Sequence, residues 1–324
     1  MKKWMTRLCI PVFGLSMLVS AGAQSAQWPQ STVKLVVPFP PGSSNDSFAR
    51  ILSQALQEKT GQTFIVENRP GASGSIGIRE VAQAKPDGHT VLVVSNSMVT
   101  NLTLPNQVNY DVFRDFEPVS MAATLPVVMV VNGGLPVANI SEFIALAKKE
   151  PGTLKYGSSG TGSPHQLTAE LFQSLTGTRL LHVPYKGQNP ILMDLLAGRI
   201  DVAFLTLGPS LQYIEAKKLT SMGMLGEERT ELAPDIPTLE ENGVKGLDMG
   251  WWLGVFLPKG TNPEIVDALG QDIVRLSNDD AFKKKLKQVS IGAVGSTPAE
   301  FRSALKREIE TWKKVAKAAG IKEQ

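Results

Sequence analysis

Short β-branched runs alternate with amphipathic helical segments along most of this chain, and this alternation restricts the possible folds most strongly. Runs typical of buried strands occupy residues 32–37, 62–66, 90–94, 126–131, 180–183 and 201–205. Helical periodicity lies between and after them, as in residues 48–56, 141–149, 189–197 and 298–319. The alternation predicts an α/β protein with mostly parallel sheets and helices on their faces. The pattern starts afresh after residue 126, so we expect two α/β units.

The first residues have the pattern of an export signal. Lys2, Lys3 and Arg7 precede an apolar run that ends near Ala23, where small residues suit a signal peptidase. This run is shorter than the roughly 20 residues that a membrane-spanning helix requires. We therefore predict a signal peptide at 1–23, cleaved near Ala23, and a periplasmic location. An N-terminal anchor that stays attached is the alternative.

Removal of this signal changes the chemistry of the remaining chain. The single cysteine, Cys9, lies within it, so the mature protein would have no disulfide, thiolate metal site or cysteine nucleophile. The whole chain carries 33 Lys and Arg against 30 Asp and Glu, and three of the basic residues belong to the signal. The mature protein is then neutral, which argues against nucleic acid or an anionic membrane surface as its partner.

Two loops join a strand to a helix and are rich in small polar residues, at 39–46 and 158–165. The first N–H groups of a helix lack partners within the helix and carry partial positive charge. Glycine allows the backbone to approach a ligand closely, and hydroxyl groups add further donors. Both loops therefore suit an anion such as a carboxylate.

Each loop also has a purely structural interpretation. Ser44 or Asn45 could cap the first helix, with Asp46 opposite its dipole. Ser163 could cap the second helix, with Gln166 completing a capping box. Capping leaves the run of Gly, Ser and Thr before Ser163 unexplained, so we favour a functional role for that loop.

Catalytic patterns are weak. The three histidines, His89, His165 and His182, lack the spacing of a metal site, and we predict no metal and no cofactor. His165 could act as a base for Ser159 or Ser163, but a histidine at a helix start is more often a ligand donor or a packed residue. The pair Trp251–Trp252 could form a ligand platform, although a strand that enters the core is the preferred interpretation.

Several segments resemble the signatures of one receptor family. They are Val37-Pro-Phe-Pro-Pro-Gly-Ser-Ser-Asn-Asp46, Val66-Glu-Asn-Arg-Pro-Gly-Ala-Ser-Gly-Ser-Ile-Gly77, Tyr156-Gly-Ser-Ser-Gly-Thr-Gly-Ser-Pro-His165, His182-Val-Pro-Tyr-Lys-Gly187 and Asp201-Val-Ala-Phe204. In this order they resemble the Bug family, the solute-binding receptors of tripartite tricarboxylate transporters. The resemblance covers essentially the whole mature chain.

This resemblance implies a two-domain type II periplasmic-binding-protein fold with two crossover strands and a central ligand cleft. We expect one discontinuous domain at 24–129 and 228–324 and a second at 130–227. The resemblance implies no enzymatic activity. Carried over by position, it assigns the ligand site to the following residues: Phe39, Gly42, Ser43, Ser44, Asp46, Ser95, Ser159, Gly160, Thr161, Gly162, Ser163, His165, Tyr185 and Thr206.

The resemblance also implies the partners. We expect a monomer that captures a small carboxylate, an organic acid or an acidic amino acid, for the membrane permease subunits of a tripartite transporter. A receptor that docks on a membrane sensor and a secreted serine hydrolase are the alternatives. The chain departs from the family pattern at Ser43, where a second glycine is common, and at Gln188 and Asn189, where small residues are common. The last two affect the end of the cleft that sets ligand identity.

Overall fold

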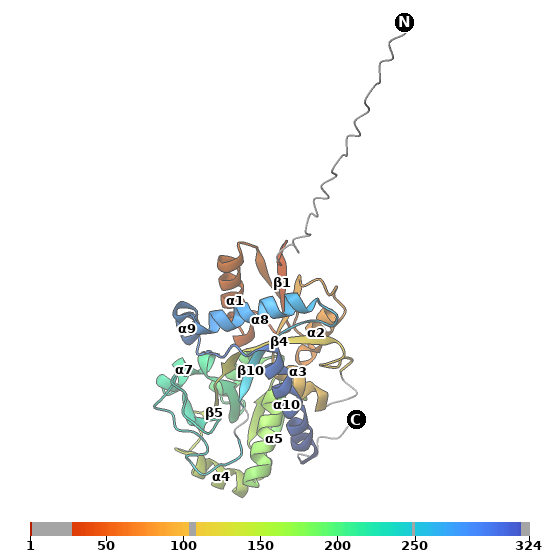
Figure 1. Ribbon diagram of the computed structural model, residues 1–324. Helices are drawn as coiled ribbons and strands as arrows, with labels where there is room; N and C mark the ends of the chain where they lie inside the picture. The colour runs from red at the N-terminus through yellow and green to blue at the C-terminus, as the bar shows by residue number, and fades with distance from the viewer. Residues whose placement is uncertain (2–27, 104–107, 248–249, 319–324) are drawn as a thin grey trace.

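The computed structural model describes residue 1 and residues 28–103, 108–247 and 250–318. Within these residues the chain forms two sheets with helices around each (Figure 1). The predicted α/β class is therefore confirmed. The expectation of mostly parallel sheets is wrong: both sheets are mixed, with four parallel and five antiparallel strand pairs among the described residues, because strands distant in sequence are inserted antiparallel into each sheet. Apart from residue 1, the predicted signal peptide at 1–23 lies outside the described residues.

The first sheet has six strands in the order β11-β4-β10-β3-β1-β2. Its strands are β1 (Val33–Val37), β2 (Phe64–Asn68), β3 (Thr90–Ser95), β4 (Phe116–Leu125), β10 (Trp251–Pro258) and β11 (Gly292–Ala293). β1 pairs in parallel with β2 and β3, whereas β10 runs antiparallel between β3 and β4. We call this sheet and its helices the first lobe. The helices are α1 (Ser44–Thr60), η1 (Ala72–Gly74), α2 (Ser75–Ala82), α3 (Ser97–Thr100), η2 (Asn101–Thr103), α8 (Pro263–Asn278) and α9 (Asp280–Lys287).

The second sheet has five strands in the order β7-β6-β8-β5-β9. Its strands are β5 (Val127–Asn132), β6 (Lys155–Ser158), β7 (Leu181–Pro184), β8 (Val202–Thr206) and β9 (Leu219–Met224). β6 is parallel to β7 and β8, and β5 is antiparallel to β8 and β9. With its helices it forms the second lobe, which is the lower part of Figure 1. These helices are α4 (Ile140–Lys149), α5 (Pro164–Thr176), α6 (Gln188–Leu196) and α7 (Leu207–Glu215).

The chain passes between the lobes twice. Pro126 alone separates β4 of the first sheet from β5 of the second, and the chain returns between β9 and β10. The last helix, α10 (Pro298–Ala318), packs against β4 and α3 of the first lobe and against α5 of the second. The assignment of 24–129 and 228–324 to one domain and of 130–227 to another stays our proposal.

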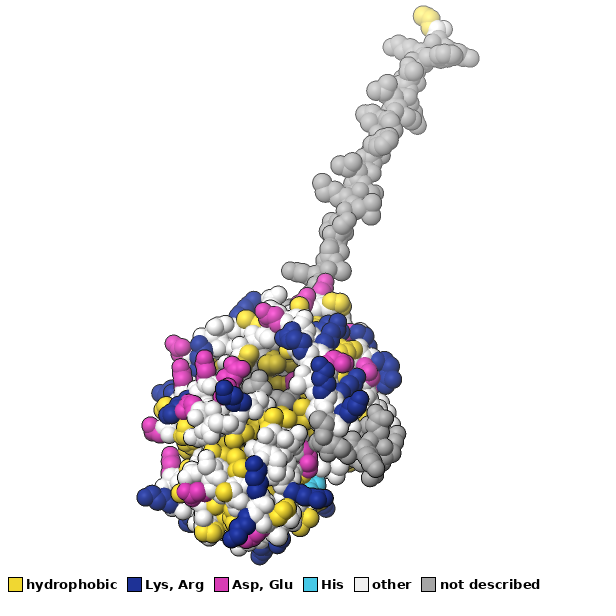
Figure 2. All heavy atoms as spheres, turned by 90° about the horizontal axis from the view of Figure 1, so that it is seen from below, with side chains coloured by type: hydrophobic (Ala, Val, Ile, Leu, Met, Phe, Trp, Pro, Cys, Tyr) yellow, Lys and Arg dark blue, Asp and Glu magenta, His cyan; other side chains and the backbone are white. Residues whose placement is uncertain are grey.

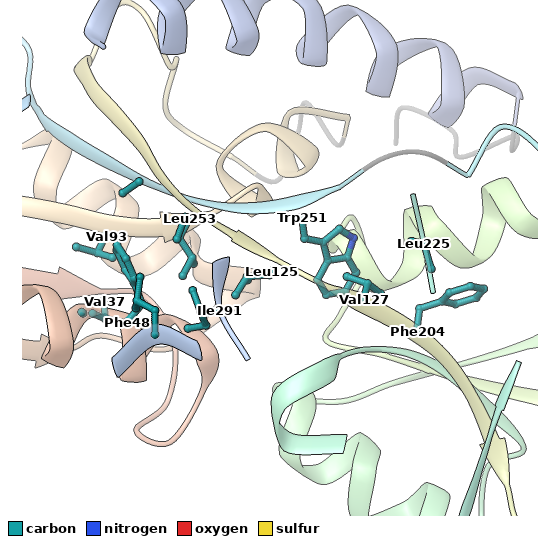
Figure 3. Close-up of a cluster of buried hydrophobic side chains, with 14 of the residues drawn as sticks. Val37, Phe48, Val93, Leu125, Val127, Phe204, Leu225, Trp251, Leu253 and Ile291 are labelled. Atoms are coloured by element: carbon teal, nitrogen blue, oxygen red, sulfur yellow. The ribbon is translucent and has the colours of Figure 1, made fainter. Parts of the chain in front are cut away.

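A hydrophobic core continues through the junction of the lobes. Figure 3 shows Leu125 and Trp251 between Phe48 of the first lobe and Phe204 of the second, within one buried cluster. Trp251 and Trp252 are both buried in β10, so the preferred interpretation of this pair as a core strand is confirmed. Burial of apolar area on this scale is the main stabilising contribution to the fold.

The two predicted binding loops lead into capped helices. The Ser43 side chain accepts from Asp46 N and caps α1, one residue before the two candidates expected from the sequence. Ser163 caps α5, as expected from the capping interpretation, and Pro164 follows it at the first helical position. Gln166 accepts from Gly162 N, one residue ahead of the usual capping-box partner. These caps fix the chain direction where each helix begins.

On the face shown in Figure 2, acidic and basic side chains are interspersed, with apolar atoms visible between them. Among the described helices, none combines the length and the apolar character needed to cross a membrane.

Candidate functional site

Two adjoining cavities lie where the lobes face each other. The inner cavity, of about 110 Å³, is lined from the first lobe by Phe39, Pro40, Ser43, Ser44, Asn45, Ser95, Leu125 and Trp251. From the second lobe it is lined by Ser159, Pro164, His165, Lys186, Gly187, Gln188, Asn189, Pro190, Thr206 and Pro209. The outer cavity is larger, about 700 Å³, and shares Phe39, Pro40, Ser159, Lys186 and Gly187 with the inner one.

Four helices begin at the inner cavity. Its wall includes first-turn or capping residues of α1, α5, α6 and α7. The sheet topology explains this convergence, because parallel strands deliver their following helices to the same edge. Each helix start brings partial positive charge and N–H groups without partners inside the helix. The cavity wall therefore has the electrostatic character of an anion site.

The charged side chains at the two cavities also favour an anion. Among the described residues that line either cavity, none is acidic, and Lys186 is the only lysine or arginine. Lys186 is exposed and lies on the wall shared by both cavities. In the described part of the chain, no cluster of three His, Cys, Asp or Glu residues could hold a metal ion.

Three residues that line the inner cavity, Ser44, Thr206 and Gln188, form hydrogen bonds that connect the two lobes. Ser44 Oγ and Thr206 Oγ1 are 3.0 Å apart. Gln188 locks Thr206, because its Oε1 accepts from Thr206 N at 2.8 Å and its Nε2 donates to Thr206 Oγ1 at 2.8 Å. Gln188, which the sequence showed only as a departure from the family pattern, therefore holds the cavity wall in place through Thr206.

The outer cavity has its own contact between the lobes. The Ser73 hydroxyl lies 3.5 Å from Ser159 O and 3.4 Å from Thr161 O. Asn101 Nδ2 donates to Ser73 O at 3.0 Å and holds this turn from behind. Ala72 and Ser73 have φ values of 46° and 52°, in the left-handed region that side chains other than glycine rarely adopt. This strained turn lies opposite the glycine-rich loop of the second lobe.

His165 lies in the first turn of α5 at the inner cavity. Its Nδ1 is 2.9 Å from Ser159 Oγ, and its ring contacts the Trp251 ring edge-on with centroids 4.5 Å apart. Burial lowers the pKa of His165 to about 4, so the imidazole is uncharged at neutral pH. Its Nε2 is buried and makes no well-aligned hydrogen bond in the described structure, although the Gln188 side chain beside the ring opposes the lowering of the pKa in part.

Most of the predicted ligand residues line a cavity, and four of them do not. The inner wall includes Phe39, Ser43, Ser44, Ser95, Ser159, His165 and Thr206. The outer wall includes Phe39, Ser159, Gly160, Thr161 and Tyr185. The predicted residues outside both described linings are Gly42, Asp46, Gly162 and Ser163.

Asp46 holds its loop in shape. Its carboxylate accepts from Gly42 N at 2.9 Å, Arg50 Nε at 3.0 Å and Asn68 Nδ2 at 3.0 Å. Burial alone would raise the pKa of Asp46, but these hydrogen bonds and the Arg50 charge outweigh burial and lower it. Gly162 and Ser163 have a similar role in the second loop, through the capping bonds to α5.

Sequence reasoning missed part of the wall. Asn45 and Lys186 line the inner cavity, although neither was assigned to the site, and Gln188 and Asn189, expected at the end of the cleft but not among the ligand residues, line it as well. The polar residues at 188 and 189, after Gly187 at a helix start, were the signal that could have identified the third helix at this cavity.

Comparison with known proteins assigns the chain to a family. The model of the "tripartite tricarboxylate transporter family receptor" (TctC) matches residues 48–321. This protein belongs to the TctC family. BugT of Bordetella pertussis is 33% identical over 322 residues, which are 98% of this chain and 99% of BugT. The resemblance to Bug receptors inferred from the sequence motifs is thereby confirmed.

Solved structures of TctC-like proteins confirm the fold. The periplasmic binding protein BugD is 30% identical with a TM-score of 0.84, covering 92% of this chain and 100% of BugD. The R. palustris protein Rpa4515 with adipate is 34% identical with a TM-score of 0.86, covering 91% of this chain and 99% of Rpa4515. This TctC protein therefore has the periplasmic-binding-protein fold and is a solute-binding receptor, not an enzyme.

Proposed function

We propose that this TctC protein is exported to the periplasm, captures a small organic acid by its carboxylate in the inner cavity, and presents it to the permease subunits of a tripartite transporter. The observation that carries this proposal is the convergence of four helix starts on a cavity whose described lining includes no acidic side chain. The adipate bound by the relative Rpa4515 supports the same ligand class.

The energetics are sufficient without an arginine clamp. A helix start and a neutral hydrogen bond each contribute roughly 1 kcal/mol to holding an anion in a partly buried site. Several such contributions in a closed cleft give micromolar affinity, about −8 kcal/mol. Lys186 at the shared wall adds a long-range attraction for anions before they enter.

The hydrolase alternative lacks support from the geometry. Ser159 is hydrogen-bonded to His165, but an activated serine also needs the histidine to be oriented by a third group. The other ring nitrogen, Nε2, makes no well-aligned hydrogen bond in the described structure. The receptor role in the TctC family agrees with this geometry.

A thermal-shift screen tests the proposal. The panel contains monocarboxylic, dicarboxylic and tricarboxylic acids and acidic amino acids, each beside its uncharged amide. We expect at least one acid to raise the melting temperature while its amide does not. Equal shifts with acid and amide, or no shift with any acid, would contradict carboxylate capture. Docking on a membrane sensor instead of a permease is a second candidate, and co-purification with permease subunits would separate the two.

A further inference from the structure

A group of polar side chains holds the glycine-rich loop at 158–165 without lining either cavity. We call this group the support network. Its members come from β6, α5 and β7: Tyr156, Ser158, Gln166, Glu170 and His182. His182 begins one of the sequence motifs that resemble the family signatures, and the cavity walls give it no role.

Two backbone N–H groups of the loop donate to the support network. Gly160 N donates to Ser158 Oγ at 3.1 Å, and Gly162 N donates to Gln166 Oε1 at 2.8 Å. The two glycines have φ values of 116° and 74°, and glycine has no steric preference for this region over others. Side-chain hydrogen bonds therefore hold the loop in the one conformation that forms the cavity wall.

The Ser158 hydroxyl has three hydrogen-bonding neighbours. It accepts from Gly160 N and donates to Gly160 O at 3.2 Å, and its oxygen lies 2.6 Å from His182 Nε2. A hydroxyl has one hydrogen and two lone pairs. Because that hydrogen goes to Gly160 O, His182 Nε2 must be the donor of the third bond. Acceptance by Nε2 would instead draw the hydrogen away from Gly160 O.

The His182 ring is itself held in place. It stacks on the Tyr156 ring with centroids 4.9 Å apart and an interplanar angle of 19°. The Tyr156 hydroxyl donates to Glu170 Oε1 at 2.6 Å, which ties the stacked pair to α5. Burial lowers the pKa of His182, so the ring is neutral at pH 7 and carries one hydrogen. Ser158 is fully buried, so solvent is not at hand to replace this donor.

We propose that His182 is a positioning residue for ligand capture: its Nε2–H fixes the Ser158 hydroxyl, which in turn fixes the Gly160 peptide of the loop. This inference rests on the proposed function, in which the loop contacts the ligand. His182 lines neither cavity, so its loss should weaken the binding of every acid by a similar factor. The order of preference among acids should not change.

Two substitutions separate hydrogen-bond donation from ring packing. His182→Phe keeps a flat ring that can stack on Tyr156 and removes the donor. His182→Gln removes the ring, but its amide nitrogen can occupy the place of Nε2. Ser158→Ala and the double variant with His182→Phe test whether the two residues act together. His89→Phe, in the first lobe and outside both cavity linings, is the control.

The probes are succinate, adipate, citrate and L-aspartate, each titrated calorimetrically into wild type and every variant. For each probe that binds wild type, we expect roughly a 10-fold loss of affinity in His182→Phe and in Ser158→Ala. His182→Gln should stay within about threefold of wild type, and His89→Phe should be unchanged. The double variant should bind no more weakly than Ser158→Ala, because one interaction is removed only once.

Amide hydrogen exchange of the free protein, followed by NMR, tests the loop without any ligand. Exchange of the Gly160 amide should be at least about fivefold faster in His182→Phe and Ser158→Ala, and close to wild type in His182→Gln. The Gly162 amide, which donates to Gln166, is the internal control and should keep its wild-type rate.

Equal losses of affinity in His182→Phe and His182→Gln would reduce His182 to a packing role. Additive losses in the double variant, or a changed order of preference among the probes, would show that His182 does not act through Ser158. An unchanged Gly160 exchange rate in His182→Phe would also overturn the inference. Failure of every probe to bind wild type would count against carboxylate capture itself, and the exchange rates would still decide whether His182 positions the loop.

Discussion

Ser44 and Thr206 join the two lobes by a hydroxyl–hydroxyl hydrogen bond of 3.0 Å beside the inner cavity. The two residues are 162 positions apart in the sequence and belong to the starts of α1 and α7. Thr206 also holds Gln188 through its backbone N–H and its hydroxyl. One threonine thus connects the contact between the lobes to the shape of the cavity wall.

Replacement of Thr206 by valine removes this link at nearly constant volume. The variant removes the partner of the Ser44 hydroxyl and of Gln188 Nε2, so we expect ligand affinity to fall roughly 10-fold. Isothermal titration calorimetry measures the change. The matched control is Thr261→Val, a buried threonine whose hydroxyl donates to Pro258 O at 2.7 Å away from the cavities. An equal loss of affinity in both variants would show a general effect of instability.

Lys186 is the only lysine or arginine among the described residues that line the cavities, and we predict that it acts mainly on the rate of capture. Lys186→Met should slow ligand association several-fold at low salt and flatten its salt dependence, while the dissociation rate changes less. Stopped-flow tryptophan fluorescence at two ionic strengths measures both rates. Lys148→Met, on the exposed face of α4, serves as the control. An unchanged salt dependence in Lys186→Met would contradict this role.

Gly160 faces Ser73 across the outer cavity. A Cβ at position 160 would lie 2.7 Å from Ser73 Oγ, and the φ of 116° already disfavours any other residue. Gly160→Ala should therefore displace the Ser73 hydroxyl from Ser159 O and Thr161 O and weaken ligand binding by about 10-fold, with a loss of stability of about 1–2 kcal/mol. Gly226→Ala, where φ is 111° and the nearest atom, Glu228 O, would lie 3.8 Å from the added Cβ, reproduces the backbone strain alone. Equal binding losses in the two variants would show that the contact with Ser73 is unimportant.

Glu308 gives the fold a pH dependence. Trp252 Nε1 and Trp312 Nε1 donate to its two oxygens, at 2.5 and 2.9 Å. Burial raises the pKa of Glu308 to about 7, against these two hydrogen bonds. The folded state thus keeps a proton that the unfolded chain releases above about pH 4.5. The contribution of Glu308 to stability is therefore greatest in acid and is lost as the pH rises through about 7.

Urea unfolding between pH 5 and 8 measures this contribution. The free energy of unfolding of wild type should fall by about 1–2 kcal/mol over this range, less than the full equivalent of the pKa shift because Glu308 is only partly buried. Glu308→Gln cannot ionise, so its stability should change less with pH. Identical pH profiles in the two proteins would rule out Glu308 as the source.

The local features of this fold were predictable from the sequence. Strand and helix periodicity gave the α/β class, and Ser163 with Pro164 gave the start of α5. The strand β4 was not predicted, and although Trp251 and Trp252 indicated a core strand, its place in the sheet was not, because β10 is inserted antiparallel between two strands that come more than 120 residues earlier in the chain. Pairing at such separation leaves no mark in local periodicity.

The site was predictable only in part, for the same reason. The loops at 39–46 and 158–165 were identified from composition, but Gln188 and Thr206 gain their roles from contacts that the sheet topology creates. Asp46 is a polar residue in one of these loops and was therefore expected to contact the ligand. Its hydrogen bonds with Gly42 and Asn68 show that it supports the loop instead. Likewise Asn45 and His165 meet at the inner cavity from different lobes, a relation that sequence spacing does not encode.

The most direct test of carboxylate capture is a crystal structure of the receptor with the acid that gives the largest thermal shift. The account predicts carboxylate density in the inner cavity, within hydrogen-bond distance of first-turn N–H groups of α1 and α5. Carboxylate density confined to the outer cavity or to the surface, with the inner cavity holding only water, would contradict it.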